Sequence, residues 1–218
     1  MPTSNLSQVV KLLELILLLK PNSILDVGVG FGKYGLLLRE YLELWDGRGV
    51  YNQWKKRIDG IEVFPGYLTA VHHYIYDHIY VGDALDVLPT TPDKYDLILL
   101  VDIIEHFSLE DGLRLLQYAA ECGRNVLIST PKCLAPQSNA FGNPYETHRF
   151  QWTKGDFGVF KNICFVRDRQ SLIVWIGDFA VTLRKTRINR VWGKSFPFLV
   201  QPVRAMKSLL CCHALRRS

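Results

Sequence analysis

The feature that most constrains the fold is a repeated alternation of short apolar runs with segments of helical periodicity. Apolar runs of β type occupy residues 23–28, 58–63, 78–84, 95–104 and 125–130. Between them, apolar residues recur at the spacing of one helix face. The run 95–104 is apolar nearly throughout, which is typical of a central parallel strand that is covered on both faces. This rhythm predicts βαβ units and a parallel sheet between two layers of helices.

The last two apolar runs depart from this pattern. Residues 163–168 and 171–179 are separated by only two residues, too few for the crossover that joins parallel strands, so they predict an antiparallel hairpin. We therefore expect a doubly wound, Rossmann-like α/β sheet of seven strands, mostly parallel, with a C-terminal antiparallel hairpin strand. The expected helices cover residues 6–19, 33–44, 65–76 and 108–123.

Length and charge predict one domain and a tail. The 218 residues suffice for a single α/β domain, which we place at residues 1–180, followed by a basic tail at 181–218. Residues 1–178 hold 17 Lys and Arg against 21 Asp and Glu, whereas residues 179–218 hold 9 basic residues and no acidic one. The net charge of +5 therefore belongs to the tail.

Within the tail, Val203, Met206, Leu209 and Leu210 recur at helical spacing, which predicts a short amphipathic helix. It has two expected positions, docked on the protein's own acidic body or lying on an anionic membrane surface. The apolar stretch at residues 9–20 contains Lys and Glu and favours neither a membrane span nor a signal peptide. We expect a cytoplasmic protein with peripheral contact to the inner membrane surface as an option.

The glycine-rich stretch DVGVGFGKYG, residues 26–35, fits two kinds of ligand loop. Residues 30–35 match the dinucleotide pattern G-x-G-x-x-G, whereas residues 26–32 read D-x-G-x-G-x-G. A pyrophosphate on a helix N-terminus is an anion, and a carboxylate beside it would repel it. Asp26 therefore suits a cationic ligand better, although a nicotinamide-dinucleotide-binding Rossmann protein stays open.

This acid-and-glycine form resembles the first motif of the class I S-adenosylmethionine-dependent methyltransferases, and the resemblance covers roughly residues 20–180. It implies that S-adenosylmethionine, which carries a sulfonium and an ammonium, is the cofactor. It also implies that Glu62 binds the ribose hydroxyls and that Asp83 with Ala84 meets the adenine. Glu62 lies farther from the glycines than usual, which an insertion at 45–57 explains. The expected cofactor-binding residues are Asp26, Gly28, Gly30, Gly32, Glu62, Asp83, Ala84 and Asp102.

The expected catalytic residues are two histidines. His106 follows the apolar run 95–104, and His148 lies on the long segment 131–152, which we expect to cover the acceptor. A general base contributes about 10²- to 10⁴-fold, and histidine is the first candidate near neutral pH. The segment also offers a mix of polar and aromatic side chains that suits an acceptor pocket, namely Tyr145, Glu146, Arg149 and Trp152.

The sequence predicts no metal site, and His72 and His73 receive no role. Asp102 has no companion Asp-Asn pair and the 5 cysteines form no C-x-x-C pair, so we expect no metal. His72 and His73 are expected on a partly exposed helix face.

The resemblance implies a methyltransferase for a small-molecule, sugar or lipid-linked glycan acceptor. An RNA methyltransferase whose basic tail binds phosphates is the second possibility. A non-enzymatic binding module ranks last, because it would be expected to lose the acids at positions 26, 62 or 83.

Overall fold

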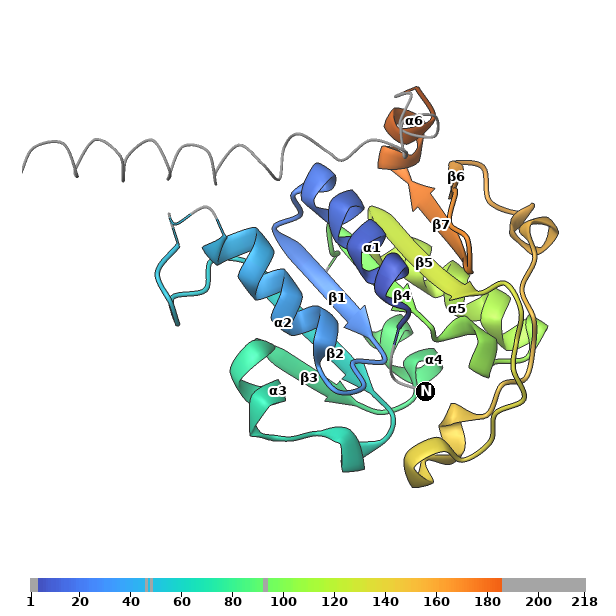
Figure 1. The fold of residues 1–218 in the computed structure, drawn as a ribbon, viewed down its shortest axis with the longest axis horizontal. Helices are drawn as coiled ribbons and strands as arrows, with labels where there is room; N and C mark the ends of the chain where they lie inside the picture. Colours follow the sequence, from blue (N-terminus) through green and yellow to red (C-terminus); the bar gives the residue numbers. More distant parts are fainter. Residues whose placement is uncertain (1–3, 46, 48, 92–93, 186–218) are drawn as a thin grey trace, which may run out of the picture.

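The computed structural model describes residues 4–45, 47, 49–91 and 94–185, and seven strands there form one sheet (Figure 1). The strands are β1 (Ser23–Val27), β2 (Arg57–Glu62), β3 (His78–Val81), β4 (Leu97–Val101), β5 (Asn125–Pro131), β6 (Ile163–Val166) and β7 (Ser171–Gly177). Their order is β3-β2-β1-β4-β5-β7-β6, and β7 runs antiparallel to both β5 and β6. The predicted seven-stranded, mostly parallel sheet with an antiparallel strand is confirmed.

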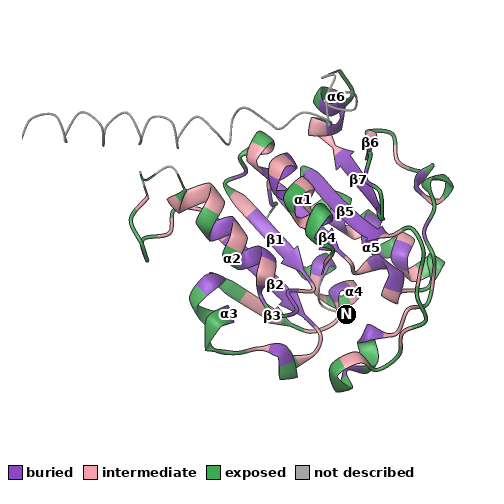
Figure 2. Cartoon of the chain, viewed as in Figure 1, coloured by how far each residue is buried: buried purple, intermediate pink, exposed green. Residues whose placement is uncertain are grey.

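Helices cover both faces of the sheet. They are α1 (Leu6–Leu19), α2 (Lys33–Arg39), α3 (Ala70–Ile75), α4 (Ala84–Val87), α5 (Leu109–Cys122) and α6 (Asp178–Lys185). Side chains of α1, α2, α3 and α6 share one hydrophobic core, and those of α4 and α5 share the other. Alternate residues of β4 point to opposite cores, Leu97 and Leu99 to the first and Ile98 and Leu100 to the second. For this reason β4 is buried along its whole length (Figure 2).

Several predicted helices are shorter than expected. The helix predicted at 33–44 is α-helical to Arg39 and continues as a π-helical turn, Glu40–Leu44. The helix predicted at 65–76 is a 3₁₀ turn, Pro65–Tyr67, followed by α3. Ser108 caps the N-terminus of α5, because its side chain accepts a hydrogen bond from the Asp111 N–H.

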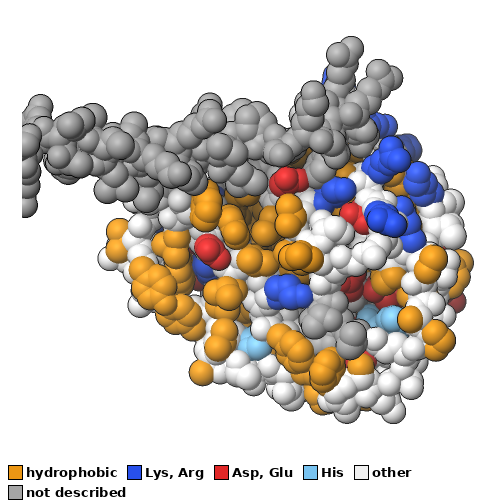
Figure 3. Space-filling model, viewed as in Figure 1, with side chains coloured by type: hydrophobic (Ala, Val, Ile, Leu, Met, Phe, Trp, Pro, Cys, Tyr) orange, Lys and Arg blue, Asp and Glu red, His pale blue; other side chains and the backbone are white. Residues whose placement is uncertain are grey.

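The C-terminal end of the fold lies beyond the predicted domain boundary. Helix α6 continues past residue 180 and buries Ala180 and Leu183 against the sheet, so residues 181–185 belong to the folded unit. On the face drawn in Figure 3, Lys and Arg side chains gather over the part where β6, β7 and α6 lie. The amphipathic helix predicted near residues 203–210 lies outside the described residues. Among the helices that are described, none is both long and apolar enough to cross a membrane.

Candidate functional site

A cavity lies at the carboxyl ends of β1, β2, β3 and β4, the side on which open α/β sheets bind their ligands. Its wall includes seven of the predicted site residues, Gly28, Gly30, Glu62, Asp83, Ala84, Asp102 and His106. Three predicted residues, Asp26, Gly32 and His148, are not part of this wall. The wall also contains residues that were not assigned to the cofactor site, among them Lys33, Tyr67, Asn143, Tyr145, Glu146 and Arg149.

The turn after β1 requires glycine by its backbone geometry. Gly28 has φ +75° and Gly32 has φ +79°, in the left-handed region that side chains disfavour. A Cβ on Gly28 would lie 2.0 Å from Cδ1 of Ile103, so the segment after β4 packs directly against this glycine. Gly32 is the N-cap residue of α2, which begins at Lys33.

Glu62 joins the end of β2 to the glycine loop. One carboxylate oxygen accepts the Gly30 N–H at 2.9 Å and the other accepts the Phe64 N–H at 2.9 Å. The side chain is 4% exposed, and burial raises the pKa of Glu62 although these hydrogen bonds oppose the shift. A carboxylate has about four acceptor positions, so Glu62 keeps the capacity to accept two hydroxyl groups.

The acids at the ends of β3 and β4 are held in place by their neighbours. Asp83 caps α4 by accepting the Leu85 N–H at 2.9 Å. Asp102 has a left-handed backbone, φ 55°, and its two carboxylate oxygens accept from Gln8 Nε2 at 2.9 and 3.1 Å. Burial raises the pKa of Asp102. Gln8 also accepts the Ser171 hydroxyl at 2.7 Å, so α1 fixes the site from far away in sequence.

Asp26 was expected among the cofactor-binding residues, but its carboxylate does not line the cavity wall. Its carboxylate is 2% exposed and accepts the Tyr76 hydroxyl at 2.6 Å, and that hydroxyl accepts the Gly35 N–H at 3.2 Å. Burial raises the pKa of Asp26 to about 7. Asp26 is therefore connected to α2 through Tyr76, the residue after α3, whose hydroxyl bonds to both Asp26 and the Gly35 N–H.

His72 corrects the expectation of an exposed histidine. The ring is 2% exposed, donates from Nε2 to the Gly30 carbonyl at 2.9 Å and accepts the Thr69 N–H at Nδ1. The Thr69 and His72 spacing is that of a capping box, which was the available signal in the sequence. His72 thus stabilises the glycine loop through its hydrogen bond to the Gly30 carbonyl. His73 is exposed, as expected.

The structure brings the two predicted catalytic histidines together. Their ring centroids are 5.1 Å apart. His106 Nδ1 bonds to the Thr147 carbonyl at 3.2 Å, and His148 Nδ1 bonds to the Ala135 carbonyl at 2.7 Å. A carbonyl only accepts, so each Nδ1 donates and each Nε2 presents a lone pair in the neutral ring. Burial lowers the pKa of His106, which favours that neutral form.

The long segment 131–152 is tied to the end of β4. The backbone N–H groups of Arg149 and Phe150 both donate to the Glu105 carbonyl, at 2.8 and 3.2 Å. Trp152 Nε1 donates to the Ile104 carbonyl at 2.9 Å, and this ring is buried in the core rather than in the acceptor pocket. Of the four residues that suggested such a pocket, Tyr145, Glu146 and Arg149 line the cavity.

Comparison with known proteins connects this fold to a class. The sequence matches no family model, and no curated protein sequence matches it. Solved structures do match at low identity. The N-terminal domain of EvdMO1, determined with S-adenosylhomocysteine (SAH) and D-fucose, has a TM-score of 0.59 at 13% identity over 80% of this chain and 84% of that chain.

Two further solved structures have a similar fold. A SAM-dependent methyltransferase from Archaeoglobus fulgidus has a TM-score of 0.56 at 15% identity, covering 79% of this chain and 94% of that chain. Magnesium protoporphyrin IX methyltransferase (ChlM) from Synechocystis PCC 6803, with SAH bound, has a TM-score of 0.53 at 14% identity, with coverages of 79% and 83%. The chain therefore has the fold of S-adenosylmethionine-dependent methyltransferases.

Proposed function

We propose that this protein is an S-adenosylmethionine-dependent methyltransferase for a small-molecule, sugar or lipid-linked glycan acceptor. One observation carries the proposal. Glu62, Asp83 and Asp102 follow three strands of the sheet and meet the glycine loop in a single cavity. The cofactor supplies a methyl group that is already activated by a positively charged sulfur. The protein's part is then to bind, align and exclude water.

The charge of the cavity wall suits this cofactor. The wall contains the carboxylates of Glu62, Asp83, Asp102, Asp111 and Glu146, against the cations of Lys33 and Arg149. A negative wall favours the sulfonium and ammonium groups through simple Coulomb attraction. In this proposal Glu62 binds the ribose and Asp83 the adenine, which is supported by the acceptor positions that Glu62 retains for two hydroxyls.

The same contacts disfavour a nicotinamide dinucleotide. Pyrophosphate binding in a glycine loop uses backbone N–H groups at the start of a helix. Here the Gly30 N–H already donates to the carboxylate of Glu62, and the Gly28 N–H donates to the Ile61 carbonyl at 2.8 Å. A pyrophosphate at this loop would meet a carboxylate in place of free donors. The antiparallel β7 also departs from the all-parallel dinucleotide sheet.

Tyr67 lines the cavity and belongs to a group of aromatic rings that adjoins it. Tyr67 lies edge-on to Phe31 at 5.1 Å between centroids, and Phe31 contacts Phe141 at 5.5 Å in the same way. Tyr145 and Arg149 line the adjoining wall. Ring faces with nearby hydrogen-bonding groups suit a sugar or an aromatic ring system, which supports a small-molecule or glycan acceptor.

An RNA acceptor and a membrane-bound acceptor both depend on the basic tail, which lies mainly outside the described residues. The acidic cavity wall favours the small-molecule or glycan proposal, because phosphate groups are repelled by it. We keep peripheral membrane contact as part of the proposal, since it would bring the enzyme to a lipid-linked acceptor.

Titration calorimetry tests the cofactor directly. We expect the full chain to bind SAH and to show no heat with NAD⁺ or NADP⁺ at the same concentrations. Transfer of a labelled methyl group to a panel of sugars, phenols and lipid-linked glycans then tests the acceptor. Binding of NAD⁺ with no response to SAH would overturn the proposal.

A further inference from the structure

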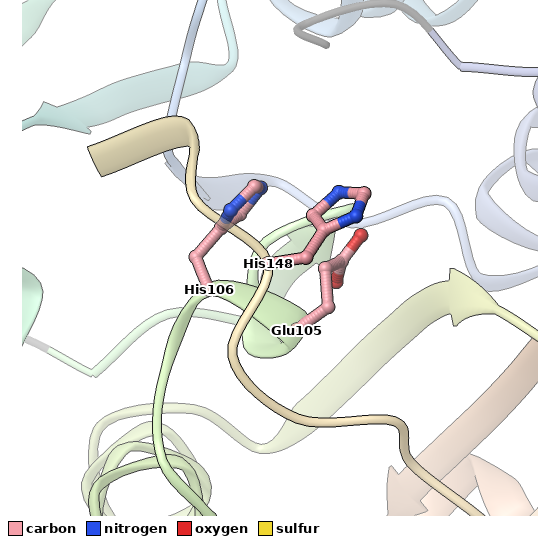
Figure 4. A group of neighbouring side chains, drawn as sticks. All are labelled: Glu105, His106 and His148. Carbon is pink, nitrogen blue, oxygen red and sulfur yellow. The ribbon is translucent and has the colours of Figure 1, made fainter. Parts of the chain in front are cut away.

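Three side chains of types that can bind metal ions lie close together beside the cavity, and they come from two segments that are distant in sequence. Glu105 and His106 belong to the 3₁₀ turn after β4, and His148 belongs to the segment 131–152. One ligand atom of each lies within 4.8 Å of the others. In Figure 4 the three side chains project to the same side of the chain, with the Glu105 carboxylate next to the His148 ring.

The backbone holds these two segments in register. The Glu105 carbonyl accepts the N–H groups of Arg149 and Phe150, so the peptide that follows His148 is bonded to the residue that carries the carboxylate. The His148 N–H itself donates to the Gln137 carbonyl at 3.1 Å. The approach of His148 to Glu105 and His106 is therefore built into the main chain and does not depend on side-chain rotation alone.

Both histidines have the outer contact that is typical of metal ligands. A histidine that binds a metal usually donates its other ring N–H to a carbonyl or carboxylate, which fixes the ring and directs the free nitrogen. His106 does so to Thr147 and His148 to Ala135. Each Nε2 is then left with a lone pair, and the two rings lie 5.1 Å apart.

The carboxylate offers the independent observation. Glu105 is 1% exposed, and its Oε2 has no hydrogen-bond partner among the described residues. A buried polar atom without a partner costs free energy, and native proteins leave few of them. A cation that binds Oε2 together with the two imidazoles would satisfy it.

We propose that Glu105, His106 and His148 form a site for a divalent first-row transition-metal ion, such as Mn²⁺, Co²⁺ or Zn²⁺. Two imidazoles and one carboxylate favour such ions over Mg²⁺ and Ca²⁺, which prefer oxygen ligands. With bonds of about 2.1 Å, ligand atoms on one ion lie about 3 to 3.5 Å apart, so the ion draws these atoms closer by up to about 1.5 Å. This site replaces the expectation of a metal-free enzyme.

The metal site deepens the proposed function and rests on it for its purpose. His106 lines the cavity, so an ion bound by this ring would lie at the cavity wall, where we place the acceptor. An ion lowers the pKa of an oxygen bound to it, so the proposed acceptor atom is a hydroxyl oxygen. In the reaction, the hydroxyl proton leaves to water, the oxygen–methyl bond forms, and the electron pair of the methyl–sulfur bond goes to sulfur. The histidines then act as ligands rather than as general bases, because one Nε2 lone pair cannot do both.

Binding of Co²⁺ alone to the full chain, without a purification tag, tests the site independently of activity. All proteins compared in this experiment carry C211S and C212S, because Cys211, Cys212 and His213 are adjacent in sequence and can bind the same ions. We expect one Co²⁺ per chain by calorimetry, with the visible absorption of a protein-bound ion. H148A should weaken binding at least about 10-fold. His73 is exposed on α3, away from the cluster, and H73A should leave binding unchanged.

A second set of measurements separates failure of the site from failure of the proposed function. E105Q keeps the shape of the buried side chain and should also weaken Co²⁺ binding, while SAH affinity measured in EDTA stays at the wild-type value for both variants. Absence of Co²⁺ binding, or equal binding by wild type and H148A, overturns the metal site. Loss of SAH binding by the wild-type chain would instead overturn the cofactor assignment and leave the metal result standing.

Discussion

Replacing Glu62 with Gln tests the central contact of the candidate cofactor site. The native carboxylate accepts two backbone N–H groups at 2.9 Å, from Gly30 and Phe64. An amide has one acceptor oxygen, so its NH₂ group must face one of those N–H groups. The variant therefore leaves a backbone donor unpaired in a buried place and offers fewer acceptor positions to a ribose.

The structure sets the size of both effects. An unpaired buried group costs about 1 to 3 kcal/mol, which is the expected loss in the free energy of unfolding. The lost ribose contact is on the same scale, so the affinity for SAH should fall by about 5- to 150-fold. Chemical denaturation gives the first quantity and titration calorimetry the second. Glu121→Gln is the matched control, because Glu121 is exposed near the end of α5 that is distant from the carboxyl ends of the strands.

Competition with nucleosides shows whether the contact is to the ribose. Wild-type protein should prefer adenosine to 2′,3′-dideoxyadenosine as a competitor of SAH, and Glu62→Gln should reduce that preference. If the folded variant keeps both the wild-type SAH affinity and the full preference for adenosine, then Glu62 does not bind the ribose and the reasoning fails.

Three further predictions concern the loop, the buried acid and the tail. Gly28→Ala should lower the free energy of unfolding by about 1 to 3 kcal/mol in denaturation experiments, because its Cβ would lie 2.0 Å from Ile103 Cδ1 at φ +75°; an unchanged midpoint would contradict this. For Asp26, the native pKa of about 7 exceeds the ordinary value of 3.8, so wild-type stability should fall as pH rises from about 4 to about 7, and Asp26→Asn should remove about 2 to 4 kcal/mol of that fall. A stability difference between the two proteins that does not vary with pH would refute it. If the tail contacts membranes, anionic vesicles should sediment the full chain but not a chain truncated after Lys185, where the described fold ends, and salt should weaken the effect; equal sedimentation of both, or of neither, removes the membrane contact.

Much of the fold was predictable because its signals are local. The strand β4 is apolar along its whole length, and such a run by itself predicts a strand that is buried on both faces. The hairpin of β6 and β7 followed from a connection too short for a parallel crossover. The helix boundaries were less accurate, since the π-helical turn after Arg39 and the break before Ala70 depend on packing against neighbouring segments.

The site residues also divide into those with a local sequence signal and those that depend on contacts between distant segments. Glu62, Asp83 and His106 were predictable because each follows a recognisable strand, and parallel strands end at one edge of a sheet. Gln8 was not, because its contact with Asp102 joins α1 to the end of β4 across a large sequence separation. The meeting of His148 with Glu105 also depends on the course of a segment that has no periodic pattern.

The segment after β2 supplies the contacts of Asp26 that could not be read from the sequence. The acid was assigned to the cofactor site from its charge and from its place before the glycines, and in the structure it accepts a hydrogen bond from the hydroxyl of Tyr76. His72, one helical turn earlier, bonds to the Gly30 carbonyl. Two side chains of this segment thus stabilise the glycine loop. Tyr76 does so through Asp26 of β1, and His72 does so through the loop backbone at Gly30. These hydrogen bonds fix the glycine loop next to the cavity, and the carboxylates that line the cavity are those of Glu62 and its neighbours at the strand ends.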